Sequence, residues 1–270
     1  MFLSLAREAG ARTVLFPSAK FMTWERIRAL AKKCDVVLNN SAEEESLEIA
    51  KTIESAGTPV LDPTRSFYFC EDKWMFYTHC RRLGIPTPKT YLLPFALYQC
   101  YEPIERLIKL SGAVVIKNIF SSNGNFVDRA KTIKQAIEMI KKFRKGDQAP
   151  LIAQEYIKNS HKVFRVTVIN GKIVQAVVKK SKNWKCTGRF LSASAPAFTV
   201  TPKLEKMCIK ISKVLNLPWC GIDLMRKGQS WVMIEVNSSP GMDFVETETK
   251  KLYKHLLQYL IDVSQQWWKL

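Results

Sequence analysis

The dipeptide Asn170-Gly171 constrains the fold of this chain more than any other short segment. It separates two runs in which apolar and polar residues alternate, residues 162–169 and 172–178. Asn-Gly accepts the positive φ angles of a two-residue hairpin turn, so this pattern is the strongest short-range signal of a β-hairpin. Residues 221–225 and 231–237 form a second pair of strand-like runs, joined by Lys227-Gly228-Gln229. The C-terminal part of the chain is therefore expected to contain an antiparallel sheet.

Two helices are predicted in the same part of the chain. Thr201 is a suitable N-cap, and Pro202 stands at the first helical position, where an N–H would lack a partner anyway. One helical face is apolar at Leu204, Met207, Ile211, Val214 and Leu215. The last helix presents Leu252, Tyr253, Leu256, Leu257, Leu260 and Ile261. Residues 151–270 are interpreted as one unit of sheet and helices.

The first 70 residues alternate between helix and strand. An opening helix is followed by a strand at residues 13–16, a helix at 24–33, a strand at 35–38, a helix at 43–56 and a short strand at 58–62. Such alternation predicts a small α/β lobe with a parallel sheet. Because the chain opens on a helix, we expect the lobe to be truncated, without the strand that such lobes usually place first.

Residues 71–150 are interpreted as a central unit. The whole chain is therefore expected to be an α/β protein built of α+β lobes. Asp72 can cap a helix that ends at Leu83-Gly84. A strand at residues 113–117 precedes a polar loop at 121–125, and Thr132 with Gln135 forms a capping box for the next helix. The central unit is therefore expected to consist of strand, loop and helix.

Charge and composition limit the class of partner. The chain has 42 Lys and Arg against 24 Asp and Glu, and the net charge of +18 attracts nucleotides, acidic peptides, polyglutamylated coenzymes or nucleic acid. It also fits a solvated, lysine-rich surface. No dense basic run carries interleaved aromatic residues, which disfavours a nucleic-acid partner. The seven cysteines and three histidines lack ligand spacing, which disfavours disulfides and zinc. Without a signal peptide or a run of about 18 apolar residues, a cytoplasmic protein with no membrane partner is expected.

The second hairpin carries the sharpest group of candidate site residues. The two-residue period of a strand places Glu235 and Asn237 on one face, while Ile234 and Val236 point to the other. The short turn brings Asp223 of the preceding strand close to opposite Glu235. Two carboxylates and a carboxamide form a hard oxygen site that suits Mg²⁺ shared with phosphates. Alternatively, Asp223 and Glu235 pair with lysines across a solvated sheet face.

These residues belong to a series of ordered motifs between residues 70 and 250. The motifs are Asp72-Lys73-Trp74, Gly84-Ile85-Pro86-Thr87-Pro88, Val115-Ile116-Lys117, Gln154-Glu155-Tyr156-Ile157, Gly221-Ile222-Asp223-Leu224 and Ile234-Glu235-Val236-Asn237-Ser238-Ser239-Pro240-Gly241. In order and rough spacing, the series resembles the RimK-like branch of the ATP-grasp ligases. The resemblance implies an ATP-grasp fold.

The resemblance also implies a role for each matching residue. Asp223, Glu235 and Asn237 match ligands of one or two Mg²⁺ (or Mn²⁺) ions that bridge ATP phosphates. Lys73 and Lys117 match lysines that contact the nucleotide, Gln154, Glu155, Tyr156 and Ile157 match the segment that recognises adenine and ribose, and Arg165 matches an arginine facing the phosphates. Alternatively, Lys117 is a routine strand-end residue and residues 154–157 are an ordinary connector.

An enzyme of this kind is expected to be an ATP-dependent carboxylate-amine ligase. ATP activates a carboxylate as an acylphosphate, which an amine attacks, so the protein supplies positioning and electrostatic stabilisation without a nucleophile of its own. We expect glutamate or another amino acid to be added to an anionic acceptor, and the enzyme to be a homo-oligomer. The basic residues proposed to attract the acceptor are Lys179, Lys180, Lys182, Lys185 and Arg189.

Three departures from the family pattern leave alternatives open. The loop at residues 121–125 has one glycine, and no acidic residue stands shortly before Arg165. Trp184-Lys185-Cys186-Thr187 replaces an Arg-x-Asn motif. Arg165 and Lys185 are the two candidate catalytic residues, and Lys185 keeps the charge of the motif's arginine without its bidentate geometry. The altered segment 184–193 supports a nucleotide-binding pseudoenzyme without turnover. The net charge supports a nucleic-acid-binding protein, for which a steep salt dependence of affinity would be diagnostic.

Overall fold

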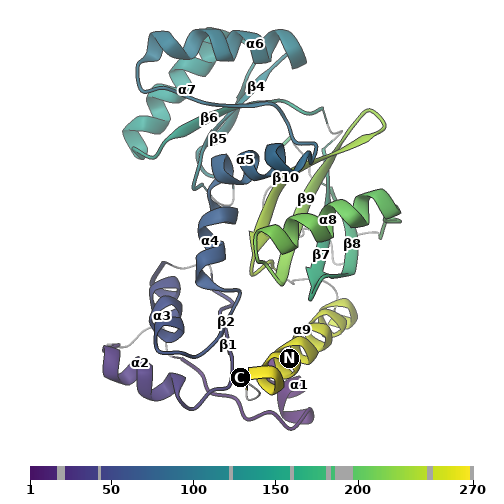
Figure 1. The fold of residues 1–270 in the computed structure, drawn as a ribbon. Helices are drawn as coiled ribbons and strands as arrows, with labels where there is room; N and C mark the ends of the chain where they lie inside the picture. The colour runs from purple at the N-terminus through teal and green to yellow at the C-terminus, as the bar shows by residue number, and fades with distance from the viewer. Residues whose placement is uncertain are drawn as a thin grey trace.

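The computed structural model contains three sheets, which Figure 1 shows one above another. It describes residues 1–16, 22–41, 44–121, 124–158, 161–180, 184–185, 197–241 and 246–267. Helices α4 (Thr64–Glu71) and α5 (Lys73–Leu83) lie between the sheets. Within the described ranges, no helix has both the length and the apolar character needed to span a bilayer. The unit boundaries after residues 70 and 150 stay predictions.

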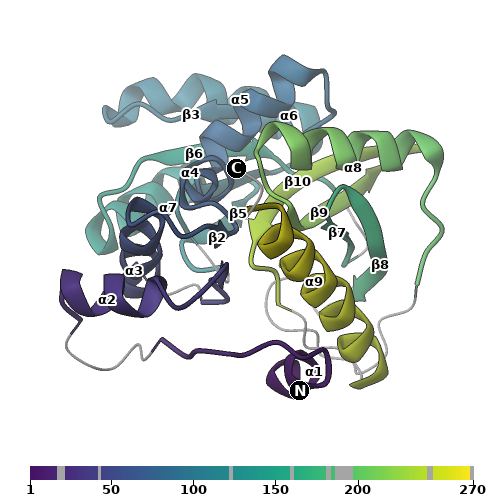
Figure 2. The same cartoon turned by 60° about the horizontal axis from the view of Figure 1, so that its bottom comes forward.

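The N-terminal elements confirm the expected parallel pairing. β1 (Val37–Leu38) and β2 (Val60–Leu61) are parallel, and the helices beside them are α1 (Phe2–Glu8), α2 (Trp24–Ala31) and α3 (Glu44–Ser55). The C-terminal helix α9 (Glu246–Trp267) packs on α1, as Figures 1 and 2 show, with the rings of Phe2 and Tyr253 5.3 Å apart. The first and last helices of the described chain therefore pack against each other.

The predicted strand at residues 13–16 is wrong. These residues are in no strand, and Leu15 is 71% exposed. A cavity of about 810 Å³ is lined by residues 11–16, by β1 and by α9 side chains such as Leu257. A strand requires a neighbour that accepts its backbone hydrogen bonds, and no described strand pairs with this segment. The β-propensity of residues 13–16 could not show whether a described strand would pair with them.

The central sheet has the order β3-β6-β4-β5 and is antiparallel throughout. Its strands are β3 (Thr90–Leu92), β4 (Val114–Asn118), β5 (Val127–Ala130) and β6 (Leu151–Glu155). η1 (Leu97–Cys100) precedes α6 (Tyr101–Ser111), and α6 and α7 (Ile133–Gly146) share one core with Ile116 and Val114. The expected sequence of strand, loop and helix omitted β3, β5, β6 and α6. The predicted loop at 121–125 includes residues 122 and 123, which lie outside the described residues, and β4 and β5 on either side of it are paired.

The C-terminal sheet has the order β10-β9-β7-β8. Its strands are β7 (Lys162–Ile169), β8 (Lys172–Lys180), β9 (Trp219–Lys227) and β10 (Ser230–Ser238). Asn170 and Gly171 have φ angles of 49° and 68°, which confirms the predicted turn. α8 (Pro202–Val214) is capped by Thr201 and shares a core with Val166, Ile222 and Val236. Arg165 and Asp223 alternate with these core residues and therefore lie on the opposite face of the sheet, where Ile169 and Trp219 pack with α9.

Asp62 joins the N-terminal and C-terminal sheets. It follows β2, and its Oδ1 accepts a hydrogen bond of 2.9 Å from Trp219 N on β9. The side chain is fully buried, and burial raises the pKa of Asp62 to about 8, although hydrogen bonds from the backbone of Trp219 and Ser239 oppose the rise. The carboxyl group is therefore mostly protonated at neutral pH.

Replacing Asp62 with asparagine should flatten the pH dependence of stability. An aspartate of the unfolded chain ionises near pH 4, whereas Asp62 ionises only near pH 8 in the folded chain. Between these values the unfolded state binds fewer protons, so the unfolding free energy of the wild type falls as pH rises, by up to about 1.4 kcal/mol per pH unit. The asparagine side chain keeps an acceptor for Trp219 N without this loss.

Urea denaturation of the wild type and the Asp62→Asn variant between pH 4 and pH 8 measures the effect. The stability difference should move in favour of the variant at higher pH. A difference that stays constant over this range would show that Asp62 ionises normally in the folded protein.

Candidate active site

Glu235 and Asp223 lie directly opposite each other on β10 and β9. Their pairing was predicted and is confirmed, but the strand is not regular. A bulge between Met233 and Glu235 adds one residue to β10, so that Met233 and Val236 both face the core. The expectation that Ile234 shares the core face with Val236 is wrong, because Ile234 is the extra residue.

Asp223 is held by a buried arginine. Arg165 lies opposite it on β7, and its Nε and one terminal nitrogen donate to the two carboxylate oxygens at 2.6 and 2.7 Å. Each residue is 7% exposed. Burial acts to raise the pKa of Asp223, but Arg165 and Lys179, whose Nζ is 3.7 Å from the carboxylate, lower it below the usual range. Asp223 does pair with cations, as the alternative interpretation expected, but in a buried rather than a solvated place.

Glu235 and Asn237 are the remaining candidate metal ligands. Their side chains lie on one face, with Asn237 Nδ2 3.4 Å from Glu235 Oε1. Among the described residues, no cluster of three or more His, Cys, Asp or Glu side chains could hold a metal ion. Two carboxylates and a carboxamide still fit Mg²⁺, which takes few protein ligands and completes its shell with phosphate and water oxygens.

Two lysines bring positive charge to Glu235. Lys117 Nζ donates to Gln154 Oε1 at 2.7 Å, and Gln154 Nε2 donates to Thr90 Oγ1 at 3.0 Å. Burial lowers the pKa of Lys117 to about 8, with Glu235 opposing and Lys73 adding to the shift. Lys73 donates to the carbonyls of Ile119, at 3.4 Å, and Ser121, and burial lowers its pKa against the charge of Glu235. Lys73 on α5 and Lys117 on β4 thus bring positive charge close to Glu235.

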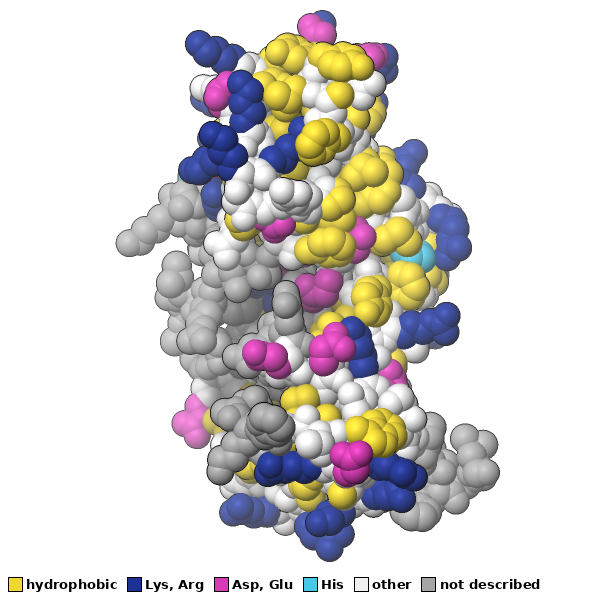
Figure 3. All heavy atoms as spheres, turned by 90° about the vertical axis from the view of Figure 1, so that its left-hand side faces the viewer, with side chains coloured by type: hydrophobic (Ala, Val, Ile, Leu, Met, Phe, Trp, Pro, Cys, Tyr) yellow, Lys and Arg dark blue, Asp and Glu magenta, His cyan; other side chains and the backbone are white. Residues whose placement is uncertain are grey.

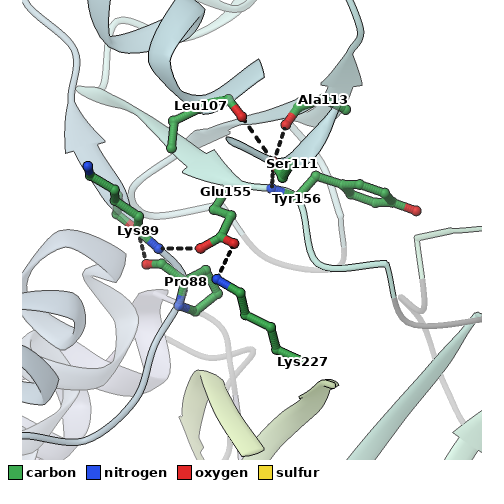
Figure 4. Close-up of polar contacts among 9 residues, drawn as sticks. Pro88, Lys89, Leu107, Ser111, Ala113, Glu155, Tyr156 and Lys227 are labelled. Atoms are coloured by element: carbon green, nitrogen blue, oxygen red, sulfur yellow. Dashed lines mark hydrogen bonds and ion pairs between the residues drawn. The ribbon is translucent and has the colours of Figure 1, made fainter. Parts of the chain in front are cut away.

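The side chains of residues 154–156 already have protein partners. Glu155 binds Lys227 and the backbone N–H of Lys89, as Figure 4 shows. Tyr156 N donates to Ser111 Oγ at 3.3 Å. The centre of the Tyr156 ring is 4.7 Å from the guanidinium carbon of Arg129 and 6.2 Å from the centre of the Trp184 ring. Ile157 is buried at 6% exposure.

Lys185 lies against the central sheet. Its Nζ is 4.0 Å from Asp128 Oδ1 on β5 and 5.8 Å from the centre of the Trp184 ring. Lys182 and Arg189 lie outside the described residues. Lys179, which was considered only for acceptor attraction, reaches Asp223 instead. The signal for it was available, because Val177 lies opposite Arg165 and Lys179 is two residues further on β8.

The exposed charges of one face are divided. Figure 3 shows Lys and Arg side chains at the upper and lower ends of this face and along its right-hand edge, with Asp and Glu side chains interspersed among them. A nucleic-acid backbone needs a continuous basic stripe. The described residues on the face in Figure 3 offer none, which disfavours the nucleic-acid alternative for this side of the molecule.

Gly221 allows the chain after β10 to approach the ion pair. A Cβ at this position would lie 2.7 Å from Pro240 Cβ and 3.1 Å from Arg165 Cδ. Such contacts are shorter than normal packing permits, so either the loop or the guanidinium would have to move. Gly221 therefore keeps Pro240 close to Arg165.

Gly221→Ala should destabilise the protein by about 1–3 kcal/mol, the usual cost of overpacking. Gly241→Ala is the matched control, because an added Cβ there meets no atom within 4 Å. Chemical denaturation of both variants checks the expectation. Equal midpoints for the two variants would show that the close approach at Gly221 relaxes without cost.

Comparison with known proteins gives three consistent likenesses. A family model described as a RimK-like ATP-grasp domain matches residues 70–260. The chain is 31% identical over 211 residues to a probable alpha-L-glutamate ligase of Halorhodospira halophila, and 35% identical over 211 residues to one of Hydrogenovibrio crunogenus, in each case covering 75% of this chain and 67% of the relative. Its fold is similar to that of D-alanine–D-alanine ligase from Bacillus anthracis complexed with ATP, with a TM-score of 0.77, 18% identity and coverage of 98% of this chain and 90% of that one.

Proposed function

Because the chain belongs to the RimK-like ATP-grasp family, we propose that ATP and Mg²⁺ bind between its central and C-terminal sheets. The family and the ATP-grasp fold expected from the sequence are confirmed. The chain is an ATP-dependent carboxylate-amine ligase. The observation that carries the placement is the Asp223–Glu235 pair, in which Glu235 interacts electrostatically with Lys73 on α5 and Lys117 on β4.

Each residue of this region has a proposed task. Lys73 on α5 and Lys117 on β4 bind phosphate oxygens, and burial of the two lysines strengthens their attraction to the phosphates. Glu235 and Asn237 hold Mg²⁺, which offsets phosphate charge when bound. Asp223 is proposed as a further ligand, and it fixes the plane of the Arg165 guanidinium. Arg165 and Lys179 then face the charge that develops during phosphoryl transfer.

The segment 154–157 is proposed to bind adenine largely through its backbone. Gln154 already contacts Lys117, Glu155 is paired with Lys227, and the Tyr156 ring packs on Arg129. The carboxylate of Glu155 therefore has no free role toward the ribose unless it leaves these partners. Backbone recognition also suits a planar base, which needs donors and acceptors at fixed places more than it needs charge.

Glutamate and an anionic acceptor are the proposed substrates. The named relatives are probable alpha-L-glutamate ligases, and the net charge of +18 attracts acidic molecules. Lys185 is proposed to attract the acceptor from the edge of the site. Its place beside Asp128 and Trp184 also supports the second candidate, a nucleotide-binding protein without turnover. Assembly into a homo-oligomer stays a prediction.

ATP should stabilise the protein in the presence of Mg²⁺. Saturation at about 100 times the dissociation constant adds about 2.7 kcal/mol to the unfolding free energy. Glu235→Gln should remove most of the metal dependence, because a carboxylate ligand is lost. Glu105→Gln is the control, since Glu105 forms an exposed ion pair with Lys109 on α6. Denaturation measured with and without ATP and Mg²⁺ tests this, and no stabilisation of the wild type would contradict the proposal.

Release of ADP tests turnover and substrates together. We expect release only when ATP, Mg²⁺, glutamate and an acidic peptide acceptor are all present. The rate should fall as salt is raised, because the Debye length shortens to about 8 Å at physiological ionic strength. ATP binding without ADP release for any amino acid would favour the protein without turnover. Equal rates with neutral and acidic acceptors at low salt would contradict the electrostatic choice of acceptor.

A further inference from the structure

The tip of the β9–β10 hairpin reaches the central sheet. Lys227, the last residue of β9, donates from Nζ to Glu155 Oε1 at the end of β6. Figure 4 shows the lysine extending from the hairpin to the carboxylate. The Glu155 side chain is 5% exposed, whereas that of Lys227 is 51% exposed. A buried carboxylate of one sheet is therefore neutralised by a lysine of the other.

The Glu155 carboxylate is held in place by contacts that do not involve Lys227. Glu155 N donates to Lys89 O at 2.8 Å, and Lys89 N donates to Glu155 Oε2 at 3.2 Å. Oε1 is left for Lys227. Because Lys89 directly precedes β3, which pairs with β6, the position of Oε1 follows the central sheet. Lys227 therefore pairs with a carboxylate whose position is fixed by the central sheet.

A second contact holds the same hairpin near the acidic residues. Met233 N, at the bulge of β10, donates to Pro86 O at 2.8 Å. We call residues 84–89, between α5 and β3, the interlobe strap. The strap contacts the hairpin directly at the bulge and, through Lys89 and Glu155, at the tip. The hairpin that carries Asp223 and Glu235 is thereby fixed at two points.

We propose that Lys227 is a positioning residue, whose ion pair with Glu155 holds Asp223 and Glu235 at a fixed place relative to Lys117 and the nucleotide. This inference rests on the proposed function of the site. Lys227 is four residues along β9 from Asp223, which corresponds to about 13 Å in a strand. It therefore acts through the hairpin and does not contact the metal or the phosphates.

Ordinary surface ion pairs contribute little to stability. The pair described here differs because loss of the lysine leaves a buried carboxylate without its cation, which is strongly unfavourable. The hairpin tip would then move away from β6, and the acidic residues would move with it. The backbone of β6 and of residues 154–157, which is proposed to bind adenine, would keep its position. Loss of Lys227 should therefore weaken metal-dependent phosphate binding more than base binding.

Titration calorimetry with ATP plus Mg²⁺ and with adenosine separates these effects. Lys227→Met should weaken binding of ATP with Mg²⁺ by about tenfold, within the range of coupling between contacting residues, and change adenosine binding by less than about twofold. Lys227→Arg should restore binding, since arginine can also pair with a carboxylate. Lys109→Met is the matched control, because it removes the exposed pair with Glu105 at 2.8 Å.

The double variant Lys227→Met with Glu155→Met distinguishes positioning from general stability. It removes the unpaired buried charge, so thermal stability should recover while binding of ATP with Mg²⁺ stays weak. Recovery of both would overturn the inference, as would a Lys227→Met variant with unchanged binding or with equal losses for ATP and adenosine. Failure of the wild type to bind ATP would contradict the proposed function itself, which is a different result.

Discussion

The buried ion pair between Arg165 and Asp223 is the interaction on which the candidate site depends. Two charges removed from water are tolerated only with good geometry, and the two contacts of 2.6 and 2.7 Å provide it. Together with Lys179 and Glu235, the pair forms a row with two cations and two anions across adjacent strands. Such a row is close to electrical balance. A bound triphosphate would upset that balance, which is why further cations are needed from Lys73, Lys117 and a divalent ion.

The candidate site combines the C-terminal sheet with residues of the central sheet and of helix α5. Lys117 on β4 of the central sheet and Lys73 at the start of α5 are buried lysines whose pKa values respond to Glu235, and the C-terminal sheet supplies carboxylates that are rigid because they lie on paired strands. The cations of the C-terminal sheet, Arg165 and Lys179, are already engaged with Asp223, so Lys73 and Lys117 add positive charge from outside that sheet. Contacts that hold the sheets together, such as those of Glu155 and Pro86, therefore belong to the chemistry as much as to the fold.

The sequence predicted what depends on local chemistry. The Asn170-Gly171 turn, the caps at Asp72 and Thr201 and the facing of Asp223 and Glu235 follow from turn residues and strand period, and all are confirmed. Features that depend on distant partners were missed or wrong. Residues 13–16 have strand-like composition but no neighbour among the described strands, β3 and β5 are too short to give a clear period, and the contact of Lys185 with Asp128 joins distant segments. The proposed roles of the site residues stay predictions.

The bulge at Ile234 has a consequence for how this hairpin can change in length. One strand has an extra residue there, yet the pairs on both sides, Met233 with Leu224 and Glu235 with Asp223, stay aligned. The extra residue can therefore be lost without turning Glu235 toward the core. When homologous chains are aligned, a one-residue gap belongs at this position and not in the Gly228 turn. Placing it in the turn would mismatch the carboxylates of proteins that share the same site.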